Sequence, residues 1–125
     1  MTATISQIRP TSGKGSRLLK LSVAWTSDAS GDFTEATQAL YGYLVAVDTI
    51  PSGVAAPTAD YDVTIVDADG LDVLGGAGAD RSATAKERAV HPTINPVVLD
   101  GAHTVTIANA GNAKSGTVNL YIETR

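Results

Sequence analysis

Residues 19–26 read Leu-Lys-Leu-Ser-Val-Ala-Trp-Thr, an alternation of apolar and polar side chains. Successive side chains of a β-strand point to opposite faces, so this pattern predicts a strand whose buried face carries Leu21, Val23 and Trp25. An amphipathic helix would instead repeat its apolar residues about every 3.6 positions, and this stretch does not. Trp25 is therefore expected to face the core of the protein.

The same alternation recurs along the chain and predicts further strands. Besides 19–25, the expected segments are 3–8, 41–47, 61–65, 71–74, 96–99, 105–107 and 118–122. Within the segment 41–47, the run from Tyr43 to Val47 is apolar on both faces, which is typical of a central strand covered on both sides. Turn residues separate the segments, and the connections 67–71 and 100–103 are short enough for tight hairpins. Residues 76–89 show no periodic pattern and are expected to form an exposed, mobile loop.

Short antiparallel strands joined by polar turns, about eight in all, predict an all-β fold. We expect an antiparallel β-sandwich, jelly-roll-like, formed by residues 18–125 as a single domain. Residues 1–17 are interpreted as an N-terminal arm that can supply a first strand. The chain has 125 residues and 43% hydrophobic content. A chain of this size buries about 65–70% of its unfolded surface, so a substantial core is expected.

The composition excludes several kinds of site. Cysteine is absent, which rules out disulfides, thiolate nucleophiles and cysteine-based zinc or iron–sulfur sites. The apolar runs fall well short of the ~20 residues that span a bilayer, so no membrane contact is expected. Residues 1–24 alternate and carry cations through their middle, unlike a secretory signal peptide. We therefore expect the chain to be made in a cytoplasm and to stay there until it is assembled.

The formal charge of -4 hides a strong segregation of charge. Residues 1–20 carry four cations and no acid, residues 21–80 carry ten acids and no Lys or Arg, and residues 81–125 carry five cations and three acids. An acidic middle repels phosphate, and no aromatic residue interleaves with the basic segment, so nucleic-acid binding is not expected. The basic segment is interpreted either as a solvated strand and loop or as a tether onto an acidic protein surface. In the second interpretation the partner-binding residues are Arg9, Lys14, Arg17 and Lys20.

No pattern of catalytic residues emerges. Gly75 to Gly78 read Gly-Gly-Ala-Gly, but the Lys-Ser/Thr of a P-loop does not follow, and a bulge or close backbone approach explains the run better. His91 and His103 lie in different segments without the i, i+4 spacing of a helical zinc site. Because no acid, base or metal ligands converge, we expect a protein that is not an enzyme and that holds no cofactor.

Asp67, Asp69 and Asp72 form the one cluster that resembles a set of metal ligands. Three carboxylates around a turn are how calcium collects oxygen ligands, although the spacing and terminal Glu of an EF-hand are missing. The dipeptide Asp69-Gly70 is by itself a strong hairpin signal. We therefore interpret the cluster as a turn with acidic strand ends, and a cation site remains the alternative.

Two stretches resemble a known class of protein. Residues 61–82 read YDVTIVDADGLDVLGGAGADRS and residues 109–122 read NAGNAKSGTVNLYI. Together they are similar to small all-β virion structural proteins of tailed bacteriophages, over somewhat more than a quarter of the chain. The resemblance implies a head-decoration, or cement, protein: a small β domain that sits on the assembled capsid, commonly as a trimer, and holds neighbouring major capsid proteins together. It carries over no catalytic or metal-binding residue.

The resemblance leaves two alternatives open. A head fibre, a connector or a tail component would also place the protein in the virion, with other virion proteins as partners. The second alternative is a soluble carbohydrate- or calcium-binding β-sandwich. Sugar sites usually stack on exposed aromatic side chains, and the expected burial of Trp25 weighs against a sugar site.

Overall fold

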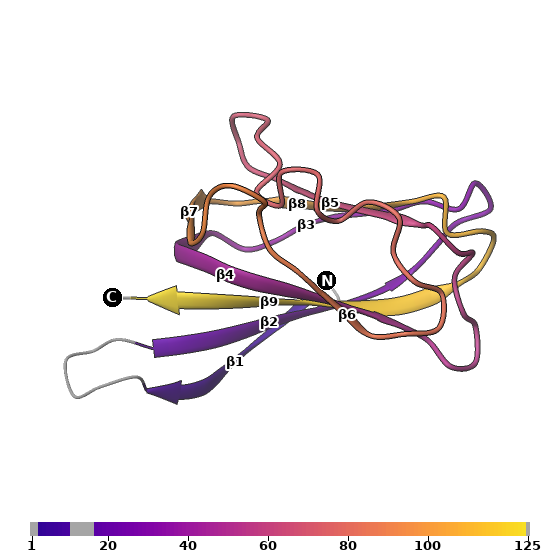
Figure 1. Ribbon diagram of the computed structural model, residues 1–125, viewed down its shortest axis with the longest axis horizontal. Coiled ribbons are helices and arrows are strands. Elements are labelled where there is room, and N and C mark those ends of the chain that lie inside the picture. The colour runs from indigo at the N-terminus through magenta and orange to yellow at the C-terminus, as the bar shows by residue number, and fades with distance from the viewer. Residues whose placement is uncertain (1–2, 11–16, 125) are drawn as a thin grey trace.

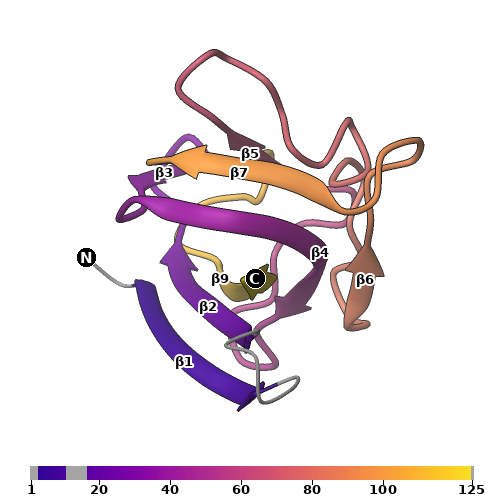
Figure 2. The ribbon, with the colours of Figure 1, turned by 90° about the vertical axis from the view of Figure 1, so that its left-hand side faces the viewer.

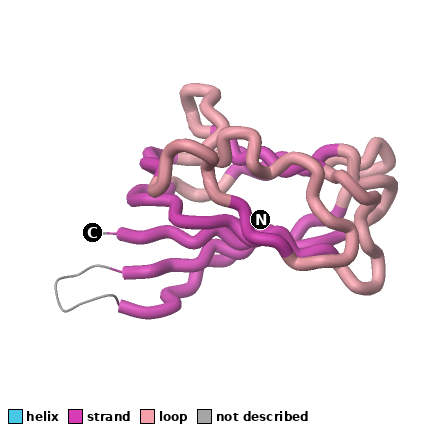
Figure 3. The backbone as a smooth tube through the Cα atoms, in the orientation of Figure 1, coloured by secondary structure: helices cyan, strands magenta, loops and turns pink. Residues whose placement is uncertain are grey.

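The computed structural model describes residues 3–10 and 17–124, in which nine strands form two antiparallel sheets (Figure 1). The strands are β1 Ala3–Pro10, β2 Arg17–Thr26, β3 Phe33–Ala36, β4 Leu40–Pro51, β5 Asp62–Val66, β6 Glu87–Ala89, β7 Val97–Gly101, β8 Thr104–Ala108 and β9 Ser115–Thr124. Strands and loops account for the whole of this part of the chain (Figure 3). The predicted all-β sandwich is therefore confirmed.

The two sheets differ in size. The large sheet has the strand order β1-β2-β9-β4-β6, and β7 also pairs with β4, whereas the small sheet has the order β3-β8-β5. In Figure 1 the small sheet lies over the large one. The core between them is built from alternate residues of the strands, among them Leu21, Val23, Trp25, Leu44, Val47, Val63, Ile65, Val105, Ile107, Val118, Leu120 and Ile122. Trp25 is buried there as predicted, with its ring centroid 5.6 Å from that of Tyr61.

The chain passes from one sheet to the other at a corner formed by two short connections. The β3–β4 and β7–β8 connections lie side by side, because the Thr37 N–H donates to the His103 carbonyl at 2.7 Å and the His103 N–H donates to Thr37 Oγ1 at 3.0 Å. As a result β7 runs beside the first half of β4, as the end view in Figure 2 shows.

The predicted strand at 71–74 is wrong. The segment folds into turns because the Asp72 carboxylate accepts hydrogen bonds from the Ile65, Leu74 and Gly76 N–H groups. Only an isolated bridge joins Asp72 to Val66. Val73 and Leu74 are nevertheless fully buried, whereas Leu71 is 55% exposed, so burial of two adjacent apolar residues without strand pairing explains the misleading pattern.

Two short strands escaped prediction. β3 is a four-residue strand whose polar residues hide its alternation. β6 is a three-residue strand inside the segment expected to be an exposed loop, and it pairs with β4 and buries Ala89. The end of the predicted loop 76–89 is therefore part of the large sheet. No helix in the described part of the chain is long and apolar enough to cross a membrane.

The strand predicted at 41–47 is central, as expected, because β4 pairs with β9 on one side and with β6 and β7 on the other. The expectation that both of its faces are covered is wrong for its first half. Tyr41 is 64% exposed and Val45 is 37% exposed. The small sheet covers only one face of β4, so the side chains of the opposite face reach the surface.

Candidate protein-binding surface

The outer face of the large sheet, which points away from the small sheet, carries three of the four tyrosines. β4 contributes Tyr41 and Tyr43, and β9 contributes Tyr121. Directly opposed residues of neighbouring strands share a face, and Tyr43 is opposed by Val98 of β7. We call Tyr41, Tyr43, Val98 and Tyr121 the tyrosine face.

The tyrosine face is unusually exposed for an apolar surface. Tyr41 and Val98 are each 64% exposed, and Val45 beside them lies where the register between β4 and β9 shifts. Single exposed apolar side chains are normal on proteins, but several on one side of a sheet mark an interaction site. Tyrosine suits such a site because its ring supplies contact area and its hydroxyl can hydrogen-bond.

Next to the tyrosine face lies a buried carboxylate, Asp48 of β4. Its side chain is only 1% exposed, and the Arg88 guanidinium holds both oxygens: Nε donates to Oδ1 at 2.7 Å and Nη2 donates to Oδ2 at 3.0 Å. The Tyr121 hydroxyl also donates to Oδ2, at 3.1 Å, and Lys86 Nζ lies 3.8 Å from the same atom. The Arg88 guanidinium carbon lies 5.2 Å from the centre of the Tyr121 ring, which adds a cation–π contact.

These contacts change the acidity of the groups involved. The hydrogen bond from Arg88 lowers the pKa of Asp48 and outweighs the opposing effect of burial. The same hydrogen bond raises the pKa of Arg88. Burial, followed by the hydrogen bond to Asp48, raises the pKa of the Tyr121 hydroxyl. At neutral pH the site therefore holds a carboxylate, a guanidinium and a neutral phenol.

The structure separates the four cations predicted to bind a partner. Arg17 is exposed at the start of β2, and Lys20 lies on the outer face opposite Tyr121. Because they are three positions apart on one strand, their side chains leave opposite faces of the sheet. The backbone of Arg9 pairs with that of Leu18 in the neighbouring strand, and Lys14 lies outside the described residues. Of these four cations, Lys20 is therefore the one whose side chain lies on the same face of the sheet as the tyrosine face.

The outer face of the large sheet carries charges of both signs. Among residues 21–80, Asp48 is the acidic residue that lies in the large sheet, and the others lie in the small sheet or in the loops around it. The cations Lys20, Lys86 and Arg88 lie on or beside the outer face of the large sheet. Acids lie there too, because Asp100 is opposed to Tyr41 and Glu123 to Tyr43.

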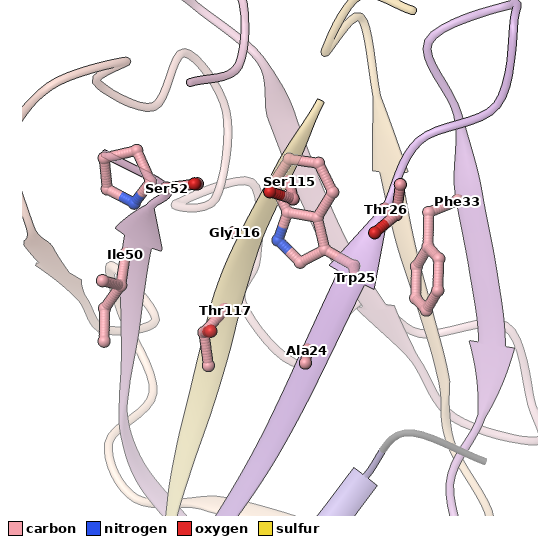
Figure 4. Close-up of a pocket in the computed structure, with 10 residues that line it drawn as sticks. Ala24, Trp25, Thr26, Phe33, Ile50, Ser52, Ser115, Gly116 and Thr117 are labelled. Atoms are coloured by element: carbon pink, nitrogen blue, oxygen red, sulfur yellow. The ribbon is translucent and has the colours of Figure 1, made fainter. Parts of the chain in front are cut away.

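A groove lies at one end of the sandwich, away from the tyrosine face. It is an open groove of about 560 Å³, drawn in Figure 4, whose lining side chains are all uncharged. They are Ala24, Trp25, Thr26, Phe33, Ile50, Pro51, Ser52, Ser115, Gly116 and Thr117. Trp25 contributes little accessible surface to this groove, because the side chain is 98% buried in the core. The groove therefore offers hydroxyl and apolar groups but no charged group.

Two of the three aspartates considered as metal ligands, Asp67 and Asp72, accept hydrogen bonds from the backbone. Asp67 Oδ1 accepts hydrogen bonds from the Asp69 and Leu71 N–H groups, at 3.0 and 2.9 Å, and the Asp67 N–H donates to the Leu71 carbonyl at 2.9 Å. A turn is therefore present at 67–71 as predicted, but it joins no hairpin, because residues 71–74 form no strand. The hairpin predicted at 100–103 is also wrong, because β7 and β8 belong to different sheets. Within residues 3–10 and 17–124, no group of three or more His, Asp or Glu side chains is arranged to hold a metal ion.

The two histidines serve separate turns. His91 Nδ1 accepts hydrogen bonds from the Thr93 and Ile94 N–H groups, at 3.2 and 3.0 Å. His103 is 1% exposed, and its Nδ1 lies 2.9 Å from the Gly101 carbonyl oxygen. Each ring therefore stabilises its own loop.

Sequence reasoning missed the tyrosine face and the Asp48–Arg88 pair. Two signals were present: Tyr41 and Tyr43 alternate, and Asp48 interrupts an apolar strand. The pairing with Arg88, forty residues away, has no local signature.

The chain was also compared with known proteins, and neither a protein-family model nor a curated protein matches it.

Proposed function

We propose that the protein is a non-enzymatic structural protein of a bacteriophage virion, of the head-decoration or cement type, and that it stabilises contacts between major capsid proteins. The observation that carries the proposal is the exposed tyrosine face on the outer side of the large sheet. Aromatic side chains and arginine dominate the binding energy of protein interfaces, and both occur there. The resemblance of residues 61–82 and 109–122 to phage virion proteins supplies the biological setting.

The basic segment is a further part of the proposal. We propose that Arg9, Lys14, Arg17 and Lys20 steer the protein toward carboxylates on its partner, with Lys20 on the outer face and Arg17 on the opposite one. Exposed ion pairs contribute only ~0.2–1 kcal/mol each, so they orient the docking while apolar contacts hold it. The virion is accordingly the proposed location of the assembled protein.

Self-association is part of the proposal. Among the described residues β1 pairs only with β2, and β6 and β7 each pair only with β4, so the large sheet has three edge strands that can accept a further partner. We propose a homo-oligomer, a trimer as the resemblance implies. Light scattering of the concentrated protein and a particle reconstruction test this, and a monomer present as isolated single copies on the particle contradicts it.

Binding to purified particles tests the main proposal. Undecorated capsids are incubated with the protein, sedimented and imaged. We expect the wild-type chain to sediment with the capsids, and the variant Val98→Asp to lose most of this binding because it places a charge in the tyrosine face. The matched control is Thr34→Asp, which places the same charge at an exposed position of the small sheet.

The outcomes separate the alternatives. Equal binding by the two variants would show that the tyrosine face is not part of the interface with the capsid. If the wild-type chain does not bind capsids but is found in purified virions, its location in the images assigns it to a head fibre, connector or tail. If it is absent from virions, the proposal is wrong.

A further inference from the structure

Arg88 is held in one orientation although it lies at the surface. Its side chain is 61% exposed, yet two hydrogen bonds fix its guanidinium to Asp48, and its cation packs against the Tyr121 ring. An arginine at an interface normally loses conformational freedom when it binds. Here the buried carboxylate has already ordered it, which is the arrangement expected of an interface hot spot.

The contacts made by Arg88 leave part of its hydrogen-bonding capacity for a partner. The bonds to Asp48 use Nε and Nη2, and a guanidinium carries further N–H donors on Nη1. Lys86 forms a salt bridge with the same carboxylate: its ammonium nitrogen lies 3.8 Å from Asp48 Oδ2, and its side chain is 59% exposed. Asp48, Lys86, Glu87 and Arg88 line a shallow groove of about 230 Å³. Two exposed cations therefore flank one surface groove.

We propose that Arg88 and Lys86 bind a carboxylate of an acidic protein segment, and that Asp48 is the residue that positions Arg88 for this contact. The inference deepens the proposed function, on which it rests, by assigning the chemistry of the partner at the tyrosine face. Tyr121, whose hydroxyl contacts Asp48 and whose ring contacts Arg88, links this groove to the tyrosine face.

A carboxylate fits the groove better than a phosphate does. The two cations share the groove with two acids, Asp48 and Glu87, so its formal charge is balanced. A phosphate concentrates two negative charges on one group beside these acids, whereas an acidic peptide presents its carboxylates singly and can place one of them against the remaining donors of Arg88 and Lys86.

Nuclear magnetic resonance titration with the peptide acetyl-tetraglutamate amide tests the inference without any capsid. At low ionic strength we expect shifts concentrated at Asp48, Lys86, Arg88 and Tyr121, and no comparable shifts with acetyl-tetraglutamine amide. Arg88→Gln should weaken binding about tenfold, the scale of a lost charge-assisted hydrogen bond. The matched control Lys114→Gln removes one cation from the β8–β9 connection and should leave the affinity within about twofold.

Two further variants test the positioning role of Asp48. Asp48→Asn should weaken peptide binding although both cations remain, and Arg88→Lys should restore only part of the affinity lost in Arg88→Gln, because an ammonium lacks the two-pronged contact. Amide spectra of each variant establish that it is folded. Equal affinity of Arg88→Gln and Lys114→Gln, or shifts spread evenly over all cations, overturns the inference. Peptide binding at this site without capsid binding contradicts only the proposed function.

Discussion

Gly78 lies so close to Val63 that a Cβ atom on the glycine would stand 2.1 Å from the Val63 carbonyl oxygen. The Val63 N–H also donates to the Gly78 carbonyl at 2.8 Å, so the loop after β5 lies along the edge of that strand. The close backbone approach expected of the glycine run is thereby confirmed.

Replacing Gly78 by alanine should destabilise the protein by about 2 kcal/mol or more, because the atom that the new Cβ meets is backbone and cannot rotate away. Urea unfolding measures the change. Gly53→Ala is the control: nothing lies within 4 Å of its added Cβ. A change within about 0.5 kcal/mol is expected there. Similar unfolding of the two variants would show that the loop moves aside.

Acid should lower the free energy of unfolding of the protein, because Asp48 becomes protonated. Its pKa is lower in the folded state than in the unfolded chain, because the folded state provides the hydrogen bond from Arg88. Its stabilisation is thus complete above the unfolded value of about 3.9 and is lost as the pH falls through the folded value. Asp48→Asn should cost about 1–3 kcal/mol at neutral pH.

The pH test compares the free energies of unfolding of wild type and Asp48→Asn from neutral pH down to about pH 2. The difference between them should shrink as the pH falls below about 4. Asp69→Asn, at an exposed turn position, serves as the control and should follow the wild type. A constant difference between wild type and Asp48→Asn would mean that the Asp48 carboxylate contributes no pH-dependent stability.

Calcium should leave the stability unchanged. The Asp67 and Asp72 carboxylates already accept backbone hydrogen bonds, which a cation would have to replace. Thermal unfolding in millimolar calcium and in chelator should give melting temperatures within about 1–2 °C. A rise of many degrees with calcium would restore the interpretation of Asp67, Asp69 and Asp72 as a cation site.

Deletion of residues 1–16 should leave a folded domain that no longer binds capsids. Leu21, Val23 and Trp25 of β2 keep their pairing with β9, so the core persists. The edge of β2 that pairs with β1 becomes uncovered, and a lower melting temperature is expected. Circular dichroism and the sedimentation assay measure both effects. Capsid binding equal to that of the full chain would mean that the basic segment is only a solvated terminus and does not bind the partner.

The amino-acid sequence by itself determined the fold class and most of the core. Alternation of side chains is a local property of a strand, so Leu21, Val23 and Trp25 could be assigned to the buried face without knowing their neighbours. The same reasoning wrongly predicted a strand at 71–74, where apolar residues are buried in turns that form only an isolated bridge. It also missed β6, because three residues are too few to show an alternation of side chains.

Only the tertiary structure decided which strand faces stay uncovered and which charges meet. Tyr41 and Tyr43 look like core residues in sequence, and they reach the surface because the small sheet covers one face of β4 alone. Asp48 and Arg88 are brought together by the pairing of β4 with β6 across forty residues of chain. Such pairings depend on contacts between distant segments, which local periodicity does not encode.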